Sequence, residues 1–354
     1  MIPILYDSTE TAFDNNGLGR LRDMISCKVT EERNGIYECD FEYPVSGAHY
    51  NEIQYGRVIG AEHDYTNDLQ PFDIVSASKP IDGKVTFHAV HISYRQSKLV
   101  AKGTSINTLT GAFEMLGNAQ PSNPFTYWTD MSSSAYMAAA DGEPRSVRSM
   151  LGGVEGSILD TYGGEYEWDK FKVKLYASRG EYKDYAIRYS VNLLNYNEDV
   201  DYSETYSAVV PYWKGTDANQ NPIFVIGDRQ EYAQTTNTGR GETIAVDLTD
   251  KFESQPTKAQ VEAMGQTYMA EQQPTLPKRN IKVDFVRLED SDEYEQFANL
   301  FNCKLCDTIR VIFPMYNMIG DFKIVKTVYN VLLEKYDEIE LGALSTTLKE
   351  ALGL

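Results

Sequence analysis

Three carboxylates occupy alternate positions in the segment GIYECDFEYP, residues 35–44: Glu38, Asp40 and Glu42. In a β-strand such residues share one face, and the strand rise sets adjacent members about 7 Å apart. Carboxylates at that separation suit an inverting glycosidase, in which a water molecule fits between acid and base. A catalytic acid also needs an apolar pocket that raises its pKa, so the neighbours of this strand decide what the cluster does.

The strand is expected to form a hairpin with the preceding residues, because Asn34-Gly35 lies between two alternating runs. A two-residue loop would set Val29 opposite Asp40. A three-residue loop of residues 33–35, with Gly35 in the left-handed conformation, sets apolar residues opposite apolar ones. Its pairs are Val29 with Cys39, Cys27 with Phe41, and Ile25 with Tyr43. This register also places Lys28 opposite Asp40 on the polar face, so we expect the three carboxylates to be solvated beside Ser26, Lys28 and Thr30.

The cysteines do not match a zinc or redox site. Cys303 and Cys306 form one Cys-x-x-Cys pair, whereas structural zinc takes four ligands. Cys27 and Cys39 stand in the two arms of the hairpin and cannot supply a second pair. The segment after Cys306 runs straight into a strand pattern, which is not the helix N-terminus of a redox motif. We expect four free thiols, made in a reducing cytoplasm.

Histidines and glycine-rich segments give no stronger signal. His88 and His91 have a metal-binding spacing only on a helix, and in a strand they point to opposite faces. His49 and His63 are the only other histidines. The segment LGGVEGS, residues 151–157, lacks the Gly-Lys-Ser/Thr ending of a phosphate loop, and no Gly-x-Ser-x-Gly elbow occurs. We therefore predict no catalytic, cofactor-binding or metal-binding residue, and no cofactor.

Composition limits the classes of partner. The 354-residue chain has 33 basic and 52 acidic residues, a net charge of −19 that disfavours binding to nucleic acid or to an anionic membrane. No stretch approaches the roughly 20 apolar residues of a membrane span. The length predicts two or three domains. Its 25 tyrosines favour strands and contact surfaces over long helices.

Periodicity predicts strands at both ends of the chain and helices between them. Residues 1–95 read as all-β, and strands return from Asn280. The stretches with helical spacing are 106–121, 143–164 and 257–274. Thr257 and Gln260 form a capping box for the last of these, and a hairpin turns at Asp169-Lys170. In residues 125–128, alternation places Phe125 and Tyr127 on one inward face of a short strand, although with Trp128 they could instead stack on sugar rings.

An internal echo links the two β-rich ends. Arg-Val-Ile occurs at 57–59 and 310–312, and Phe-Asp-Ile-Val at 72–75 is answered by Phe-Lys-Ile-Val at 322–325. A strand that opens at Lys84 is likewise answered by one near Asp337. Offsets of about 250 residues, repeated in the same order, predict a duplicated small β-domain.

One long segment, VTEERNGIYECDFEYPVSGAHYNEIQYGRVIGA at 29–61, has a characteristic look. It resembles the N-terminal signature of phage minor structural proteins of the prophage endopeptidase tail, or tail-associated lysozyme, family. The resemblance continues in order over nearly the whole chain. The further matching segments are GGVEGSILDTYGGEYEWDKFKVKLYASRG, RYSVNLLNYNEDVDYSETYSAVVPYW, LCDTIRVIF and FKIVKTVYNVLLEKYDEIELG.

The resemblance implies a mainly β, α+β fold of the baseplate-hub type, with two related β-barrel domains and an inserted α/β domain. The boundaries that we expect are 1–95 for the first barrel, 96–200 and 250–279 for the insertion, 201–249 and 280–345 for the second barrel, and 346–354 for a C-terminal tail. The resemblance also implies a homotrimer. Its six barrels would match a threefold tip to the sixfold distal tail protein and tail tube.

The expected role is therefore structural. The protein would lie at the virion tail tip after synthesis in the host bacterial cytoplasm, would contact the distal tail protein, the tail tube and receptor-binding proteins, and would let DNA pass through an acidic channel without specific binding. Cys306-Asp307-Thr308 stands where the family has Gly-Asp-Thr, and Ser190 stands where glycine is usual. The resemblance therefore does not decide the backbone conformation of these two turns.

Family members with peptidase or lysin activity carry that domain after the hub, and this chain ends just after the second barrel, so we expect no enzyme. Two other functions remain open. One is a cell-wall hydrolase that uses Glu165 or Glu167, and the other is a carbohydrate-binding module that uses Trp128 or Trp168.

Overall fold

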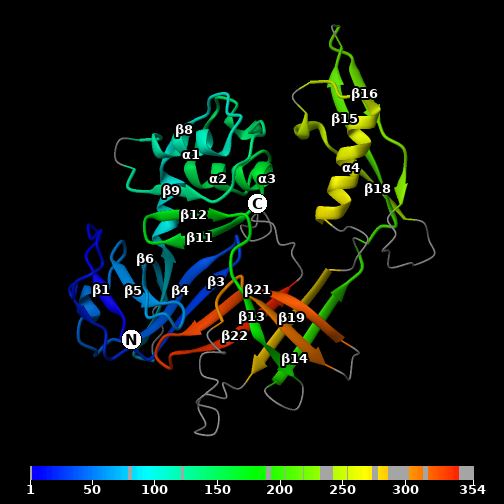
Figure 1. The fold of residues 1–354 in the computed structure, drawn as a ribbon. Helices are drawn as coiled ribbons and strands as arrows, with labels where there is room; N and C mark the ends of the chain where they lie inside the picture. The colour runs from blue at the N-terminus through cyan, green and yellow to red at the C-terminus, as the bar shows by residue number, and fades with distance from the viewer. Residues whose placement is uncertain are drawn as a thin grey trace.

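The computed structural model describes residues 2–78, 82–120, 123–188, 193–203, 205–217, 219–231, 242–252, 254–272, 278–285, 303–313 and 318–342. Within these residues the fold is mainly β with few helices, as expected (Figure 1). No helix in this part of the chain is long and apolar enough to cross a membrane. The expected tail at 346–354 and Ser190 lie outside the described residues.

One sheet of 13 strands runs through most of the molecule. Its main path is β14-β19-β22-β21-β3-β4-β7-β6-β5-β1-β2, with β20 beside β21 and β13 beside β20. The N-terminal strands are β1 (Ile4–Tyr6), β2 (Gly19–Arg20), β3 (Ser26–Glu32), β4 (Tyr37–Pro44), β5 (Val58–Glu62), β6 (Leu69–Ser78) and β7 (Lys84–His91). The later strands are β13 (Tyr182–Arg188), β14 (Leu193–Asp201), β19 (Lys278–Phe285), β20 (Thr308–Phe313), β21 (Met318–Asn330) and β22 (Lys335–Gly342).

The β3–β4 hairpin has the register that the sequence predicts. Val29 pairs with Cys39 and Cys27 with Phe41, and all four side chains are buried. Two details differ from the expectation. Asn34, with φ of 56°, takes the left-handed conformation expected of Gly35. Ile25 lies outside β3, is 49% exposed and does not pair with Tyr43; its N–H donates to Glu42 O instead.

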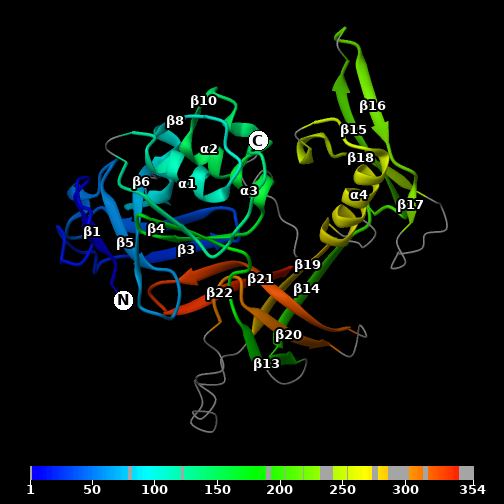
Figure 2. The ribbon, with the colours of Figure 1, turned by 45° about the horizontal axis from the view of Figure 1, so that its top comes forward.

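A helical layer covers part of the N-terminal half of the sheet (Figure 2). Helix α1 (Leu109–Gly117) buries Leu109, Ala112, Phe113 and Leu116 as predicted, and its N-cap Thr108 accepts a hydrogen bond from Gly111 N. The other elements of this segment are β8 (Val100–Lys102), β9 (Thr126–Thr129), β10 (Pro144–Ser146), α2 (Val147–Leu151), α3 (Ile158–Tyr162), β11 (Glu165–Asp169) and β12 (Lys172–Tyr176). Within the described residues, the 3-10 helices are Tyr50–Glu52, Ile92–Lys98, Ala138–Ala140 and Thr249–Lys251.

The single helix expected over 143–164 is two short helices, α2 and α3. Between them Gly153 and Gly156 have φ of 99° and 72°, which end the first helix and turn the chain. A Cβ atom at Gly156 would lie 2.5 Å from Cβ of Ala138, so glycine also permits close packing here.

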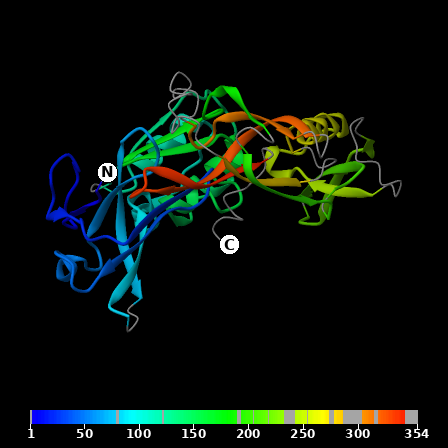
Figure 3. The ribbon, with the colours of Figure 1, turned by 90° about the horizontal axis from the view of Figure 1, so that it is seen from below.

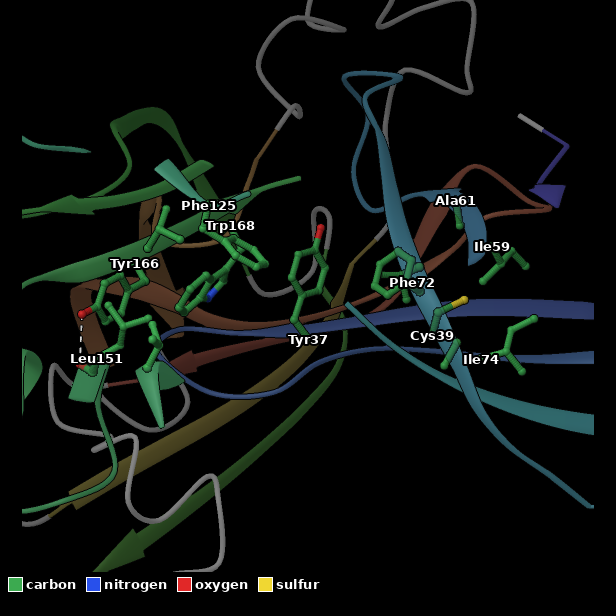
Figure 4. Close-up of a cluster of buried hydrophobic side chains, with 14 of the residues drawn as sticks. Tyr37, Cys39, Ile59, Ala61, Phe72, Ile74, Phe125, Leu151, Tyr166 and Trp168 are labelled. Carbon is green, nitrogen blue, oxygen red and sulfur yellow. Dashed lines mark hydrogen bonds between the residues drawn. The ribbon is translucent and has the colours of Figure 1, made fainter. Parts of the chain in front are cut away.

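A common apolar core joins this layer to the sheet. Tyr37, Cys39 and Phe72 of the sheet belong to one buried cluster with Tyr166 and Trp168 of β11 (Figure 4). Tyr166 donates a hydrogen bond from its hydroxyl to Leu151 O at 2.9 Å, which satisfies its polar end inside the core. The helical layer is therefore fixed to the first half of the sheet by shared burial.

Residues 208–272 form a separate unit that projects from the large sheet (Figures 1 and 3). Its strands are β15 (Ala208–Thr216), β16 (Pro222–Ile226), β17 (Gln230–Glu231) and β18 (Thr243–Asp247), and helix α4 (Lys258–Gln272) packs against β15. The predicted capping box is present, since Thr257 N donates to Gln260 Oε1 at 2.9 Å and Gln260 N to Thr257 Oγ1 at 3.4 Å.

The strand pairing differs from the expected domain boundaries. Strands β13 and β14, expected in the inserted domain, pair with β20 and β19 of the large sheet. Residues 208–247, expected in the second barrel, pair only among themselves within the described residues. These pairings join residues far apart in sequence, so local periodicity does not reveal them.

The two halves of the large sheet repeat one arrangement of strands. The order β3-β4-β7-β6-β5 in the first half is matched by β14-β19-β22-β21-β20 in the second. Ile59 pairs with Phe72 and Ile309 with Phe322, so both strands of this pair are displaced by the same sequence offset between the copies. The Phe-x-Ile-Val echo is therefore in structural register, whereas Arg-Val-Ile at 310–312 lies three positions beyond the equivalent of 57–59.

The repeat extends to the turn before each hairpin. Gly56 N donates to Ile74 O, and Cys306 N donates to Ile324 O in the same way. Gly56 and Cys306 both have left-handed φ, 82° and 73°. A β-bulge follows in both copies, between Ile74 and Ser76 and between Ile324 and Lys326. The replacement of the family's glycine by Cys306 thus leaves this turn in the glycine conformation.

Candidate functional site

The three alternating carboxylates lie on the polar face of β4, where Lys84 and His88 lie beside them. Lys84 Nζ donates to both oxygens of Glu42 at 3.0 and 3.1 Å. Asp40 Oδ1 is 2.8 Å from His88 Nδ1, and Glu38 is 4.0 Å from the same ring. Burial raises the pKa of Glu38, and His88 opposes that rise. The cluster is a paired, water-accessible strand face, as the hairpin register predicts.

Lys28 does not form the expected cross-strand pair. It stands opposite Asp40 in the register, but its Nζ lies 2.8 Å from Asp337 Oδ2 on β22. The prediction considered only β4 as a neighbour of β3, whereas β21 and β22 bring a second set of carboxylates to the other side. Lys28 therefore connects the two halves of the sheet.

All four cysteines are buried and none forms a disulfide, and the Sγ atoms of Cys27 and Cys39 are 3.7 Å apart. Burial raises the pKa of Cys306 to about 12, which keeps the thiol protonated. Within the described residues, no group of three or more His, Cys, Asp or Glu is arranged to hold a metal ion.

His88 and His91 point to opposite faces of β7, as predicted. His88 is half-exposed, whereas His91 is fully buried and stacks on Tyr37 at 4.4 Å between ring centroids. Ser93 N donates to His91 Nδ1 at 3.3 Å, so Nδ1 is unprotonated and Nε2 carries the proton toward Gln70 Oε1. Burial holds the pKa of His91 well below its usual value.

We expect His91 to make the protein less stable as the pH falls below 6.5. The unfolded chain then binds a proton that the folded chain excludes, so stability decreases by at most about 1.4 kcal/mol per pH unit. In His91→Asn, the amide oxygen still caps Ser93 N but does not titrate. Urea unfolding between pH 7.5 and 5.5 should show a smaller pH slope for the variant, and equal slopes would contradict the assignment.

The aromatic candidates separate into one exposed and several packed residues. Phe125 is buried, and Tyr127 stacks on Phe113 and donates its hydroxyl to Gln96 Oε1 at 2.9 Å. Trp128 is 49% exposed. Trp168 is 5% exposed and lies under the Arg148 guanidinium at 4.4 Å, so no sugar ring can stack on it.

Glu165 and Glu167, the candidates for hydrolysis, are both held by cations. Lys323 Nζ donates to Glu165 Oε1 and Oε2 at 2.8 and 2.7 Å, and Arg33 Nη1 donates to Oε1 at 3.3 Å. Lys174 Nζ donates to Glu167 Oε1 at 2.6 Å. Sequence reasoning treated Glu165 as a possible acid, whereas the structure places it in a buried ionic cluster.

This cluster joins three parts of the chain, and we refer to it as the ionic joint: Glu31, Arg33, Glu165, Arg179, Asp307 and Lys323. Each side chain in it is at most 13% exposed. Arg179 Nη1 donates to Glu31 Oε1 at 3.1 Å, and its backbone N donates to Glu165 Oε2 at 2.7 Å. Glu31 and Glu165 thus contact Arg179, Arg33 and Lys323, whereas Asp307 is paired with Lys183.

Asp307 continues the joint into the second half of the sheet. Its Oδ1 accepts from Glu181 N at 2.8 Å, its Oδ2 accepts from Lys304 N at 2.8 Å, and Lys183 Nζ lies 3.2 Å away. Gly180 packs directly on Cys306, since an added Cβ would lie 2.2 Å from Cys306 O. The segment 178–183 is therefore clamped between β11 and β20.

The tip of the β3–β4 hairpin supplies the other side of the joint. Asn34 Nδ2 donates to Gly164 O at 2.9 Å, and Tyr166 N donates to Asn34 Oδ1 at 2.8 Å. Arg33 N donates to Val325 O at 2.8 Å. The Asn-Gly loop that identified the hairpin in the sequence thus also fixes β11 and β21 to it.

The joint has no motif in the sequence, because its partners are 132 and 158 residues apart. One local signal does exist. Lys323 stands between Phe322 and Ile324 in a strand pattern, where the first copy has Asp73, and Asp73 is held by Arg95 at 2.6 Å. A charge among buried strand residues indicates a partner elsewhere in the fold.

The geometry of the ionic joint indicates that it holds three segments of the chain together and does not catalyse a reaction. Both oxygens of Glu165 are occupied by donors from the protein, which leaves none for a substrate. A surface depression of about 410 Å³ lies at Asn16, Arg20, Arg22 and His49 and contains neither Glu165 nor Glu167. Buried charges that satisfy one another require strict geometry, so the joint specifies how the three segments sit together.

Comparison with known proteins finds the same fold in phage tail proteins. Prophage tail protein gp18 from Listeria monocytogenes EGD-e is 16% identical, with a TM-score of 0.66 over 100% of this chain and 98% of that chain. A tail protein from Neisseria meningitidis MC58 is 10% identical, with a TM-score of 0.64 over 99% and 98%. The 43 kDa tail protein of prophage MuSo2 from Shewanella oneidensis is 9% identical, with a TM-score of 0.62 over 97% and 98%.

No protein-family model matches the sequence, and no curated protein sequence matches it. The chain therefore has the fold of phage tail proteins along its whole described length.

Proposed function

We propose that this protein is a structural component of a phage or prophage tail tip, a baseplate hub that acts as a homotrimer. The observation that carries the proposal is the repeated strand order in the large sheet, which gives each chain two equivalent β-units. Three chains then supply six units. Six similar units in a ring match a threefold tip to a sixfold tail tube.

The units of this proposal follow the strand pairing. The first unit is residues 2–91, and the second combines 182–201 with 278–342. The helical layer at 92–176 and the projecting unit at 208–272 are the additions that would face the tip or the cell surface. In the first unit, the three-residue loop at 33–35 stands where the second unit has the projecting unit.

The proposed partners are the distal tail protein and the tail tube on one side and receptor-binding proteins on the other. The proposal places the protein in the virion tail tip after synthesis in the host cytoplasm, among tail-associated lysozyme proteins, and assigns it no catalytic step. The net charge of −19 supports a DNA channel that repels phosphate. A particle structure with a mainly basic lumen would contradict that role.

The mass of the native particle tests the hub directly. Light scattering of the purified protein should give three times the chain mass of 40.0 kDa. The control is the same protein in denaturant, which should give the mass of a single chain. A stable dimer would contradict the hub, and a monomer would require the tail itself to assemble the ring.

A further inference from the structure

Strand β6 has an open edge at its C-terminal end. Residues Leu69–Asp73 pair with β5, and Phe72–Ser78 pair with β7 on the other side. Beyond Asp73, no described strand occupies the β5 side. Residues 75–78 are all exposed. The backbone here therefore offers hydrogen-bonding groups to another strand.

The second copy of the repeat shows what fills the equivalent position. After the bulge at Val325, residues 326–330 of β21 pair with β3, and Lys326, Thr327 and Val328 stand opposite Glu32, Glu31 and Thr30. At the offset that relates Phe72 to Phe322, these three residues of β21 correspond to Ser76, Ala77 and Ser78. The open edge of β6 is thus the place that β3 fills on β21.

The strand equivalent to β3 is β14. The cross-strand row Val29-Cys39-Ala89 in the first unit matches the row Glu198-Ile281-Leu341 in the second, each leading to the strand that carries the bulge. Among the described strands β14 pairs only with β19, so no described strand occupies its outer edge.

The β14 strand of the same chain cannot reach β6. Six strands of the sheet lie between them, so seven strand spacings of about 4.8 Å separate them by roughly 34 Å along the sheet. Figure 1 shows β6 in the left part of the molecule and β14 on the far side of β21 and β22 from it. Two open edges with complementary positions must therefore come from two copies of the chain.

We propose that β14 of one copy pairs antiparallel with β6 of another, in the register Ser76 with Asp201, Ala77 with Val200, and Ser78 with Asp199. This contact between two chains has the same arrangement as the β21–β3 contact within one chain. It is a head-to-tail interface, which gives a ring where the rotation between successive copies closes. That closure and the number of copies in the ring rest on the proposed hub.

The hydrogen bonds between β21 and β3 show which residue pairs of this contact are hydrogen-bonded and which are not. Arg33 N donates to Val325 O, and Val331 N donates to Cys27 O. Counting inward from these bonds, Thr327 and Glu31 form a hydrogen-bonded pair, and Val328 and Thr30 form a non-hydrogen-bonded pair, in which the Cα atoms are closer. Ala77 N–H therefore faces the incoming strand, and the Ser78–Asp199 pair is of the kind in which side chains come closest.

Cysteines introduced as Ser78→Cys and Asp199→Cys in the full chain test this register. A mild oxidant should link neighbouring copies, and reduction should reverse the link. The matched control is Ala77→Cys with Asp199→Cys, which is one residue out of register and places the two thiols on opposite faces. We expect at least about tenfold more cross-linked chain in the first pair, because a disulfide needs Cβ atoms about 4 Å apart. The four native cysteines are buried and take no part.

A proline at Ala77 provides a second test without new thiols. Ala77→Pro removes an N–H that only the neighbouring copy would use, so the fold of the chain is kept. The urea midpoint should be unchanged and the native mass should fall.

A threefold particle that persists in Ala77→Pro and gives no Ser78–Asp199 cross-link overturns this interface while leaving the hub intact. A cross-link in particles that never exceed two chains retains the interface and contradicts the hub. A monomer that gives no cross-link overturns the interface, and the tail itself would then have to assemble the ring.

Discussion

Replacing Glu165 by alanine should lower the free energy of unfolding by about 3–5 kcal/mol, because the change leaves buried cations without their anion. Lys323 Nζ loses two hydrogen bonds of 2.8 and 2.7 Å, and Arg33 loses its contact at 3.3 Å. Both cations are almost fully buried, so water cannot replace the carboxylate. Urea unfolding at pH 7 should show a lower midpoint.

The control for this prediction is Glu167→Ala on the same strand. Glu167 is also bonded to a lysine, but its side chain is 29% exposed, so its loss should change the free energy of unfolding by about 1 kcal/mol or less. The comparison separates burial from the mere presence of an ion pair. Equal effects of the two substitutions would show that the ionic joint contributes no more than a surface pair.

The ionic joint is also the part of the molecule that the sequence predicts least. The β3–β4 register follows from side-chain alternation and loop length, which are both set within the short segment 26–44, and the structure confirms it at Val29 and Cys27. The contacts of Glu165 depend on how β21 returns beside β3, and Lys323 on β21 is 158 residues from Glu165 in the sequence. No local period carries that information.

The helix end and the strand pairings that differ from expectation have the same origin. Both Gly153 and Gly156 fall where a helical period continues through them, and only their left-handed φ shows that the helix ends. The second unit resumes at β19 after the projecting unit, so the pairing of β14 with β19 spans an insertion. The Phe-x-Ile-Val echo was informative because it marks the same bulged strand in both units, whereas the Arg-Val-Ile match was out of register.

The second large effect is expected at Gly180, where alanine should destabilise the protein by about 2–4 kcal/mol. Two terms add: the left-handed φ of 86°, which costs about 1–2 kcal/mol for a residue with a Cβ, and a clash with backbone. The added Cβ would lie 2.2 Å from Cys306 O and 2.6 Å from Asp307 N. Relief of the clash must move the turn that aligns Asp307 with Glu181 N.

Gly56→Ala provides the matched control, because Gly56 has a φ of 82° but no atom within 4 Å of the added Cβ. It should show the conformational term alone, about 1–2 kcal/mol. The difference between the two variants in urea unfolding then measures the close packing of the segment 178–183 on β20. If that segment could shift freely, the two substitutions would have the same effect. A larger loss at Gly180 is expected because the ionic joint holds the segment on both sides, at Glu165 and at Asp307.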